Sequence, residues 1–178
     1  GKTVRAAILV GSAGPNPMIK IAGIAVGLNK LFSDKKKPSK FMDKLSFGAY
    51  NKAVESPKTN FDWLSRDENE VQKYIDDFCG FVCTLGFYQD LINGLKQTHR
   101  PSEMSKIPVS LPILITSGDK DPVSDLGKSV KKLYDIYKAN GIKDLSLKLY
   151  EDARHEILNE TNKEEVKADI FEWIEKKL

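Results

Sequence analysis

Two loops of this sequence carry a carboxylate and an imidazole that could work together in acid–base chemistry. Asp121 lies within residues 118–123, and His155 stands further along the chain between Arg154 and Glu156. An aspartate that accepts a hydrogen bond from histidine fixes the tautomer of the imidazole and stabilises its protonated form. Such a pair can accept and return a proton, so Asp121 is a candidate acid and His155 a candidate base.

Other roles for these loops have to be weighed. Asp119 competes with Asp121 for the acid role, and the Asp-x-Asp spacing also suggests a cation site. The loop lacks the glycine at position six and the glutamate at position twelve that an EF-hand requires. His155 begins a sequence like the zinc motif H-E-x-x-H, but Asn159 replaces its second histidine. We therefore expect no metal site and no cofactor.

The serine that would complete such a machinery is missing from these residues. No G-x-S-x-G nucleophile elbow occurs in the sequence, and residues 10–14 come nearest, with Val10 in place of the first glycine. We interpret residues 11–17 as a turn that leaves a strand, since a phosphate loop would need a Lys-Ser/Thr ending. The one other histidine, His99, lies in a polar connector, and we expect it to be a solvated surface residue.

The elements that must position the two loops are short apolar runs, each followed by helical periodicity. Residues 4–10, 111–116 and 145–150 predict strands. The first two are almost continuously apolar, as in strands covered on both faces, and the third alternates, which suits a strand near a sheet edge. Strands that alternate with helices predict an α/β fold with a parallel sheet. Both loops then follow strand ends, where open parallel sheets bind ligands.

Helix signals support this order of elements. Apolar residues at helical spacing predict a helix over about residues 124–140, and Gly141 stands where a C-cap glycine belongs. A last helix runs to the chain end, and Thr161 with Glu164 resembles a capping box at its start.

The long connection between the first two strands predicts an inserted helical cap. It is rich in aromatic residues and shows helical periodicity in pieces. We therefore expect residues 1–14 and 109–178 to form a partial α/β core and residues 15–108 to form the cap. Three strands make a thin sheet compared with the usual five or six, so we also expect further strands, most simply upstream.

Composition excludes several classes of function. The net charge is +3 from 28 basic and 25 acidic residues, which gives no case for nucleic acid. Residues 35–37 form a lysine run that we interpret as a solvated loop, the alternative being a phosphate or lipid-headgroup patch. Cys79 and Cys83 have neither zinc nor redox spacing, and we expect buried, reduced thiols. With no signal peptide and no apolar run long enough for a membrane span, we expect a cytoplasmic protein.

Residues 115–123 and 149–160 resemble the acid and base loops of α/β-hydrolases. The similarity is to the lysophospholipase and monoacylglycerol lipase-like serine hydrolases, and residues 61–67 and 77–80 look like segments of that subgroup's cap. The resemblance covers the C-terminal portion of the fold, after the nucleophile elbow. It implies that Asp121 is the triad acid, that His155 is the base, and that the serine and oxyanion hole lie upstream.

The resemblance implies a carboxylic-ester hydrolase that acts on a small, lipid-like ester by a Ser-His-Asp mechanism. It implies as partner the N-terminal half of the same enzyme, and it allows a transient contact of the cap with a membrane surface. The chain alone should then be inactive. The alternative is a non-catalytic ligand- or partner-binding module of the same fold, in which Asp121 and His155 are only a buried polar pair. A flavodoxin-like phosphate binder is a weaker third hypothesis, because no phosphate-cradling glycine loop occurs.

Overall fold

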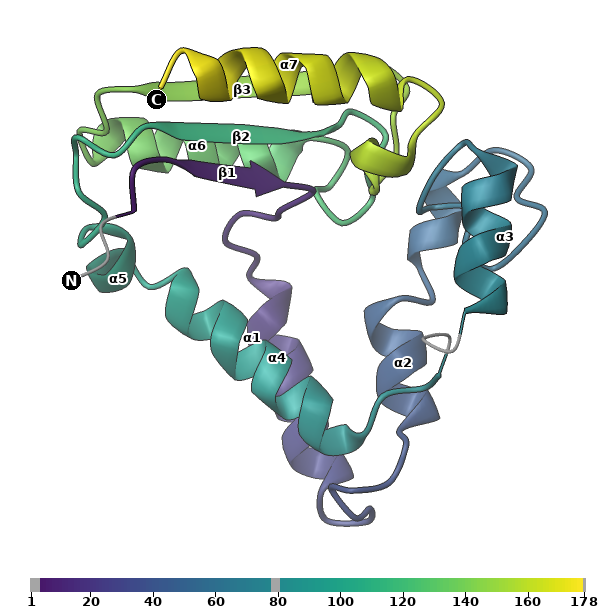
Figure 1. The fold of residues 1–178 in the computed structure, drawn as a ribbon. Coiled ribbons are helices and arrows are strands. Elements are labelled where there is room, and N and C mark those ends of the chain that lie inside the picture. Colours follow the sequence, from purple (N-terminus) through teal and green to yellow (C-terminus); the bar gives the residue numbers. More distant parts are fainter. Residues whose placement is uncertain (1–3, 78–80, 178) are drawn as a thin grey trace.

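The computed structural model describes residues 4–77 and 81–177 (Figure 1). Three parallel strands form one sheet in the order β1 (Ala7–Val10), β2 (Ile113–Gly118) and β3 (Leu145–Tyr150). The predicted α/β class and the three predicted strands are confirmed. The third strand has the predicted bounds, the second is shifted by two residues, and the first begins three residues late because residues 4–6 do not pair.

The sheet is covered on both faces at β2 and β3 (Figure 1). All six residues of β2 are buried. The leucines of β3 pack against the core under α6 (Lys128–Ala139), whereas Lys148 and Tyr150 point to the other face and donate to Asp169 of α7 (Lys163–Glu175). Since β3 is an edge strand with alternating sides, its predicted character is confirmed. β1 is the opposite edge, with three partly buried residues and Val10 exposed, so the predicted cover on both of its faces is wrong.

Helix α6 begins later than its periodicity predicts. Residues 125–127 have φ angles of 52°, 54° and 81°, which lie in the left-handed region and cannot continue a right-handed helix. Ser124 Oγ donates to the carbonyl oxygen of Asp121 at 3.0 Å and accepts from the amide of Gly127 at 3.0 Å. The residues before α6 therefore form a tight turn that fixes the backbone of Asp121. The apolar face of α6 is confirmed, with Val130, Leu133 and Tyr137 buried.

The predicted C-cap glycine at the end of α6 is confirmed, but the capping box predicted at the start of α7 is wrong. Gly141 follows the last turn of α6 with a φ of +87°, a conformation that glycine adopts without steric cost. The N-cap position of α7 is Asn162, not Thr161, and no side chain caps this end. The amide of Thr161 instead donates to the carboxylate of Glu160 at 2.9 Å, so a neighbouring acid takes over the group that the box would have used.

The connection between β1 and β2 folds into helices. They are α1 (Met18–Asn29), α2 (Lys40–Ser46), α3 (Glu68–Asp76), α4 (Leu85–Thr98) and α5 (Pro101–Met104), with a 3₁₀ turn at Tyr50–Ala53 and another at Ile157–Asn159 after β3. Helices α1, α2 and α4 enclose a second core of Val26, Met42, Leu85, Tyr88 and Ile92. The division into core and cap stays a prediction. Among the described helices, none has the length and apolar character that crossing a bilayer needs.

The cysteine prediction can be followed only in part. Cys83 is a free, half-buried thiol in the extended segment before α4, so it does not lie on a helix. Burial raises the pKa of this thiol, and the nearby carboxylate of Asp43 raises it further. Cys79 lies outside the described residues.

His99 is not the solvated residue that its polar surroundings predict. It is half-buried at the end of α4, and its Nε2 lies 3.1 Å from the carbonyl oxygen of Ala13 in the loop after β1. Burial lowers the pKa of His99, although the hydrogen bond to Ala13 works in the opposite direction. The partner is 86 positions away in sequence, so the local pattern could not reveal it.

Replacing His99 by glutamine should weaken the acid sensitivity of the fold. A histidine whose pKa is lowered by folding binds fewer protons folded than unfolded, so its contribution to stability is lost as the pH falls below its ordinary value of 6.5. His99→Gln keeps an N–H donor for Ala13 but does not titrate. Urea unfolding at about pH 7 and about pH 5 should show a smaller drop in unfolding free energy for the variant. Equal drops in both proteins would refute this role.

Candidate active site

The structure brings Asp121 and His155 together at one rim of the sheet. Asp121 follows β2 and His155 follows β3, and His155 Nδ1 lies 3.2 Å from Asp121 Oδ2. The two loops are joined by their backbones, because the amide of Lys120 donates to the carbonyl oxygen of Ala153 at 3.0 Å. Adjacent parallel strands end at the same edge of the sheet, so the contact follows directly from the pairing of β2 with β3.

Asp121, rather than Asp119, is the carboxylate that reaches the imidazole. Its side chain is fully buried and accepts hydrogen bonds from Ser117 Oγ at 3.0 Å and from the amide of Val123 at 2.8 Å. These donors compensate the charge for its loss of water and fix the carboxylate in place. Asp119 is only half-buried, and within the described residues the carboxylate that hydrogen-bonds to His155 is that of Asp121.

The imidazole of His155 is held on its Nδ1 side and free at Nε2. Its side chain is 26% exposed, and within the described part of the chain no group hydrogen-bonds to Nε2. When Nδ1 donates to a carboxylate, the neutral ring presents Nε2 as an acceptor. The arrangement can therefore take a proton at Nε2 while Asp121 stabilises the imidazolium that results.

Gly11 packs directly against His155. This residue follows β1 with a φ of +55°, and a Cβ placed on it would lie 2.9 Å from the carbonyl oxygen of His155 and 3.3 Å from its Cε1. The interpretation of residues 11–17 as a turn did not reveal this contact. The sequence signal was the glycine itself, since any other residue would both strain the backbone and displace the histidine.

Ser12 is not presented as a nucleophile. Its Oγ is buried and has no hydrogen-bond partner in the described part of the chain. The left-handed conformation lies at Gly11, one residue earlier, so the turn does not raise the serine towards His155 as a nucleophile elbow would.

Aromatic residues from the connection between β1 and β2 stand beside the pair. The rings of Trp63 and His155 are 5.4 Å apart at an interplanar angle of 37°, and Tyr50 lies 5.0 Å from Trp63. Burial raises the pKa of Tyr50, and the negative charge of Asp121 raises it further. The resemblance marked residues 61–67 as part of the cap, but sequence reasoning did not find Trp63 as a neighbour of His155.

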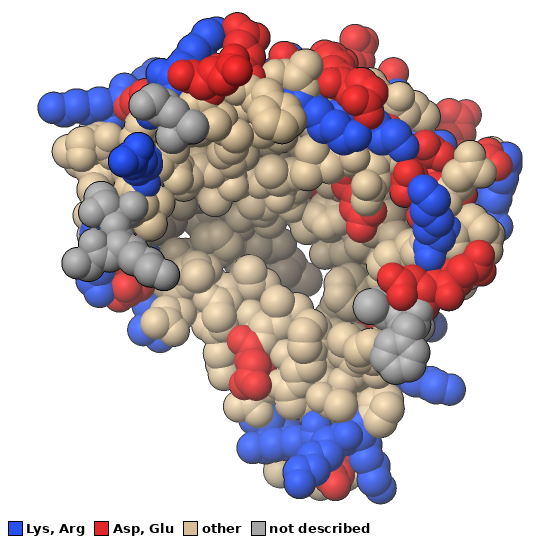
Figure 2. All heavy atoms as spheres, viewed as in Figure 1, with Lys and Arg blue, Asp and Glu red and all other residues tan. Residues whose placement is uncertain are grey.

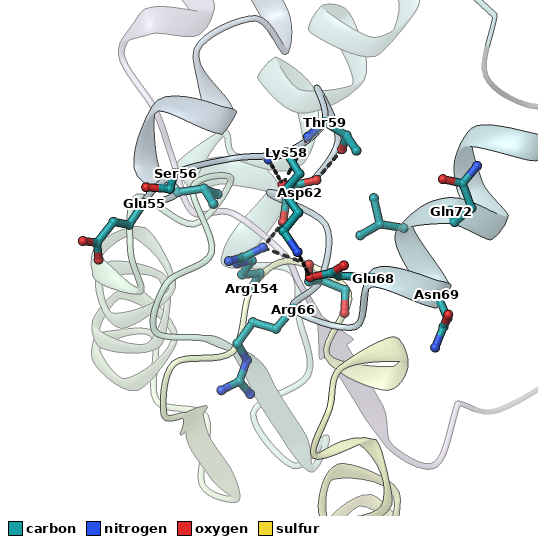
Figure 3. Close-up of a pocket in the computed structure, with 13 residues that line it drawn as sticks. Glu55, Ser56, Lys58, Thr59, Asp62, Arg66, Glu68, Asn69, Gln72 and Arg154 are labelled. Atoms are coloured by element: carbon teal, nitrogen blue, oxygen red, sulfur yellow. Dashed lines mark hydrogen bonds and ion pairs between the residues drawn. The ribbon is translucent and has the colours of Figure 1, made fainter.

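A cavity of about 430 Å³ lies beside Arg154, and charged, polar and apolar side chains all line it (Figure 3). Charged side chains of both signs surround it, namely Glu55, Lys58, Asp62, Arg66, Glu68 and Arg154. Clefts for apolar ligands are lined mainly by apolar side chains, so the six charged residues around this cavity do not favour an acyl chain as its ligand.

Comparisons with known proteins bear on the family and the fold of the chain. The family described as serine aminopeptidase, S33, matches residues 2–162. A search of curated proteins finds no match. A highly thermostable carboxyl esterase from Bacillus coagulans, solved in complex with glycerol, aligns with a TM-score of 0.87 at 23% identity, over 98% of this chain and 57% of that one. A lipase in its open form aligns with a TM-score of 0.86 at 18% identity, over 99% of this chain and 58% of that one.

A soluble variant of monoglyceride lipase from Saccharomyces cerevisiae, in complex with a substrate analogue, aligns with a TM-score of 0.62 at 18% identity, over 96% of this chain and 55% of that one. At such identities the likeness shows the fold, which is the predicted partial α/β-hydrolase fold. The chain spans little more than half the length of these structures.

Replacing Gly11 by alanine should destabilise the protein and disturb His155. The cost should be about 1–3 kcal/mol in unfolding free energy, because a left-handed alanine is strained and its Cβ collides with His155. Gly27→Ala is the matched control, since Gly27 lies within α1 and its added Cβ would meet nothing within 4 Å. That variant should be neutral or more stable. Equal urea midpoints for the two variants would contradict the account.

Proposed function

We propose that this chain, which belongs to the serine aminopeptidase S33 family of α/β-hydrolases, supplies the acid and the base of a Ser-His-Asp triad that hydrolyses carboxylic esters. The supporting observation is the 3.2 Å contact between His155 Nδ1 and Asp121 Oδ2, with Nε2 left free at the rim of the sheet. We infer that the serine and the oxyanion hole come from residues outside this sequence, because no elbow motif occurs within it.

The mechanism uses His155 twice. Its Nε2 takes the proton of the serine hydroxyl as the serine oxygen bonds to the ester carbonyl carbon, and Asp121 stabilises the imidazolium. His155 then gives that proton to the leaving alcohol as the ester C–O bond breaks, which leaves an acyl-enzyme. In the second half His155 takes a proton from water as the water oxygen bonds to the acyl carbon. It then returns the proton to the serine oxygen as the bond between that oxygen and the acyl carbon breaks, which releases the carboxylic acid.

We propose a lipid-like monoester as the substrate class. The fold is shared with proteins whose names are carboxyl esterase, lipase and monoglyceride lipase, which supports an ester rather than an amide. The family's description as an aminopeptidase makes an aminoacyl amide the competing substrate. The alternative function is a module that binds such ligands without catalysis. In that case no serine of the gene product should react with a serine-hydrolase probe.

We further propose that the region around α1 contacts a membrane surface. One side of α1 exposes Ile21, Ile24 and Leu28, and Leu31 and Phe32 follow it, with Phe32 88% exposed. Lys35, Lys36, Lys37 and Lys40 are exposed directly beyond them. Figure 2 shows basic side chains gathered at the tip of the molecule below α1 and α4. Apolar side chains beside lysines suit an anionic lipid surface.

The gene product that contains these residues should react with a fluorophosphonate probe at one serine. His155→Ala should abolish labelling and ester turnover, because no base then activates the serine, while the melting temperature stays nearly unchanged. Asp121→Asn should lower turnover by about 10⁴-fold. His99→Gln is the control and should keep full activity. The 178-residue chain alone should not be labelled.

Two results would contradict the proposal. Labelling that persists in His155→Ala would remove the base from the mechanism, and the absence of any labelled serine would favour the binding module. Parallel assays with a monoacyl ester and an aminoacyl amide decide between the two substrate classes.

Binding to anionic vesicles should depend on residues 35–37. Replacing these three lysines by glutamate should weaken binding to phosphatidylserine-containing vesicles by at least about tenfold, and added salt should weaken wild-type binding. Replacing Lys131 and Lys132 on α6 by glutamate alters the net charge at another exposed site and should weaken vesicle binding much less. Equal loss in both variants would point to net charge rather than to this surface.

A further inference from the structure

A buried carboxylate ties the loop of His155 to the connection between β1 and β2. Glu160 is fully buried and accepts from Arg66 Nε at 2.8 Å, from the amide of Arg66 at 3.1 Å, from the amide of Arg154 at 2.8 Å and from that of Thr161 at 2.9 Å. A buried carboxylate is costly unless donors surround it. Four donors do so here, and those of Arg66 and Arg154 lie on the two segments that Glu160 joins.

The histidine loop also donates hydrogen bonds to the segment between β1 and β2. Arg154, the neighbour of His155, donates from Nη1 to the carbonyl oxygens of Asp62 at 2.6 Å and Ser65 at 3.0 Å, and Figure 3 shows its guanidinium pointing towards the segment that carries Asp62. The amide of Glu156 donates to the carbonyl oxygen of Leu64 at 2.8 Å. Residues 62–66 are therefore bound to the histidine loop on both sides of His155.

This attachment places Trp63 on the imidazole. Trp63 is 8% exposed, stacks against Phe47 at 6.4 Å with an interplanar angle of 7°, and lies 5.4 Å from the ring of His155. Gly11 packs closely against the other side of the ring, since a Cβ there would lie 3.3 Å from Cε1 of His155. The imidazole thus has Trp63 and Gly11 packed against it and Asp121 at Nδ1.

We propose that Trp63, held by Glu160 with Arg66 and Arg154, is a positioning residue for His155. It keeps the imidazole in the rotamer that directs Nδ1 to Asp121 and leaves Nε2 free. That this positioning serves catalysis rests on the proposed function, whereas the packing of Trp63 on His155 is independent of that function. One consequence is that residues 62–66 stay with the histidine loop in any movement of the predicted cap.

The tautomer of His155 tests this role without any turnover. The chain contains two histidines, so ¹⁵N NMR of the labelled 178-residue chain resolves His155 once His99→Gln has assigned the other. In the wild type, the Nδ1–H form of the neutral ring should dominate. In Trp63→Leu, the share of the Nε2–H form should rise at least about twofold, because the ring can rotate away from Asp121. The backbone bonds of residues 63 and 64 remain in this variant.

Matched variants separate this role from general damage. Glu160→Gln should shift the tautomer in the same direction, and Glu164→Gln, which changes an exposed pair with Lys167, should not. If Glu160→Gln fails to fold, Trp63→Leu still decides. An unchanged tautomer in folded Trp63→Leu, alongside a change in Asp121→Ala, would overturn the positioning role and leave the Asp121–His155 pair intact. An unchanged tautomer in Asp121→Ala would instead sink the proposed function.

Turnover of the complete gene product gives a second readout. Trp63→Leu should lower kcat by about 10- to 100-fold with a smaller effect on KM, because a misplaced base affects the chemical step. Trp63→Phe, which keeps an aromatic ring at the site, should recover much of this loss. If Trp63→Leu changed KM alone, Trp63 would contact the substrate and would not position the base.

Discussion

The contact between Asp121 and His155 depends on the parallel pairing of β2 with β3. That pairing ends both strands at one rim and lets the two following loops share backbone hydrogen bonds. Asp121 can remain charged there because Ser117 and the amide of Val123 donate to it. Burial thus makes the carboxylate immobile, and its one remaining strong partner is an imidazole that is still open to solvent at Nε2.

The second constraint comes from outside the sheet. His155 lies in the loop beyond the edge strand β3, and without further packing its ring could turn freely. Residues 62–66 supply that packing, and the buried carboxylate of Glu160 holds them there. Removing one partner of such a buried group leaves the others unpaired, which costs more than the pair itself contributes. The network therefore specifies one arrangement of the histidine loop.

Much of the fold could be predicted from the sequence because its signals are local. A run of apolar residues sufficed for β2, alternation sufficed for β3, and the order of strand and loop placed Asp121 and His155 on one rim. The start of α6 was missed, because three left-handed residues are set by hydrogen bonds to Asp121 and Ser124 and not by helical periodicity. The ends of a helix or strand depend on such contacts more than its existence does.

The remaining features depend on partners far apart in sequence. His99 looked solvated because its partner Ala13 is 86 positions away, and Glu160 meets Arg66 across 94. Trp63 lies in residues 61–67, which resemble a cap segment, but no local pattern shows that its ring meets His155. Such contacts are decided by the tertiary structure, so sequence patterns could suggest the acid and the base but not the residues that hold them.

The most direct measurement is the proton NMR signal of the Nδ1–H group of His155 in this chain. A proton shared with a buried carboxylate should resonate far downfield and exchange slowly with water. The account predicts that this signal is present in the wild type, persists in Asp119→Ala and disappears in Asp121→Ala. A signal that is lost in Asp119→Ala and kept in Asp121→Ala would contradict it.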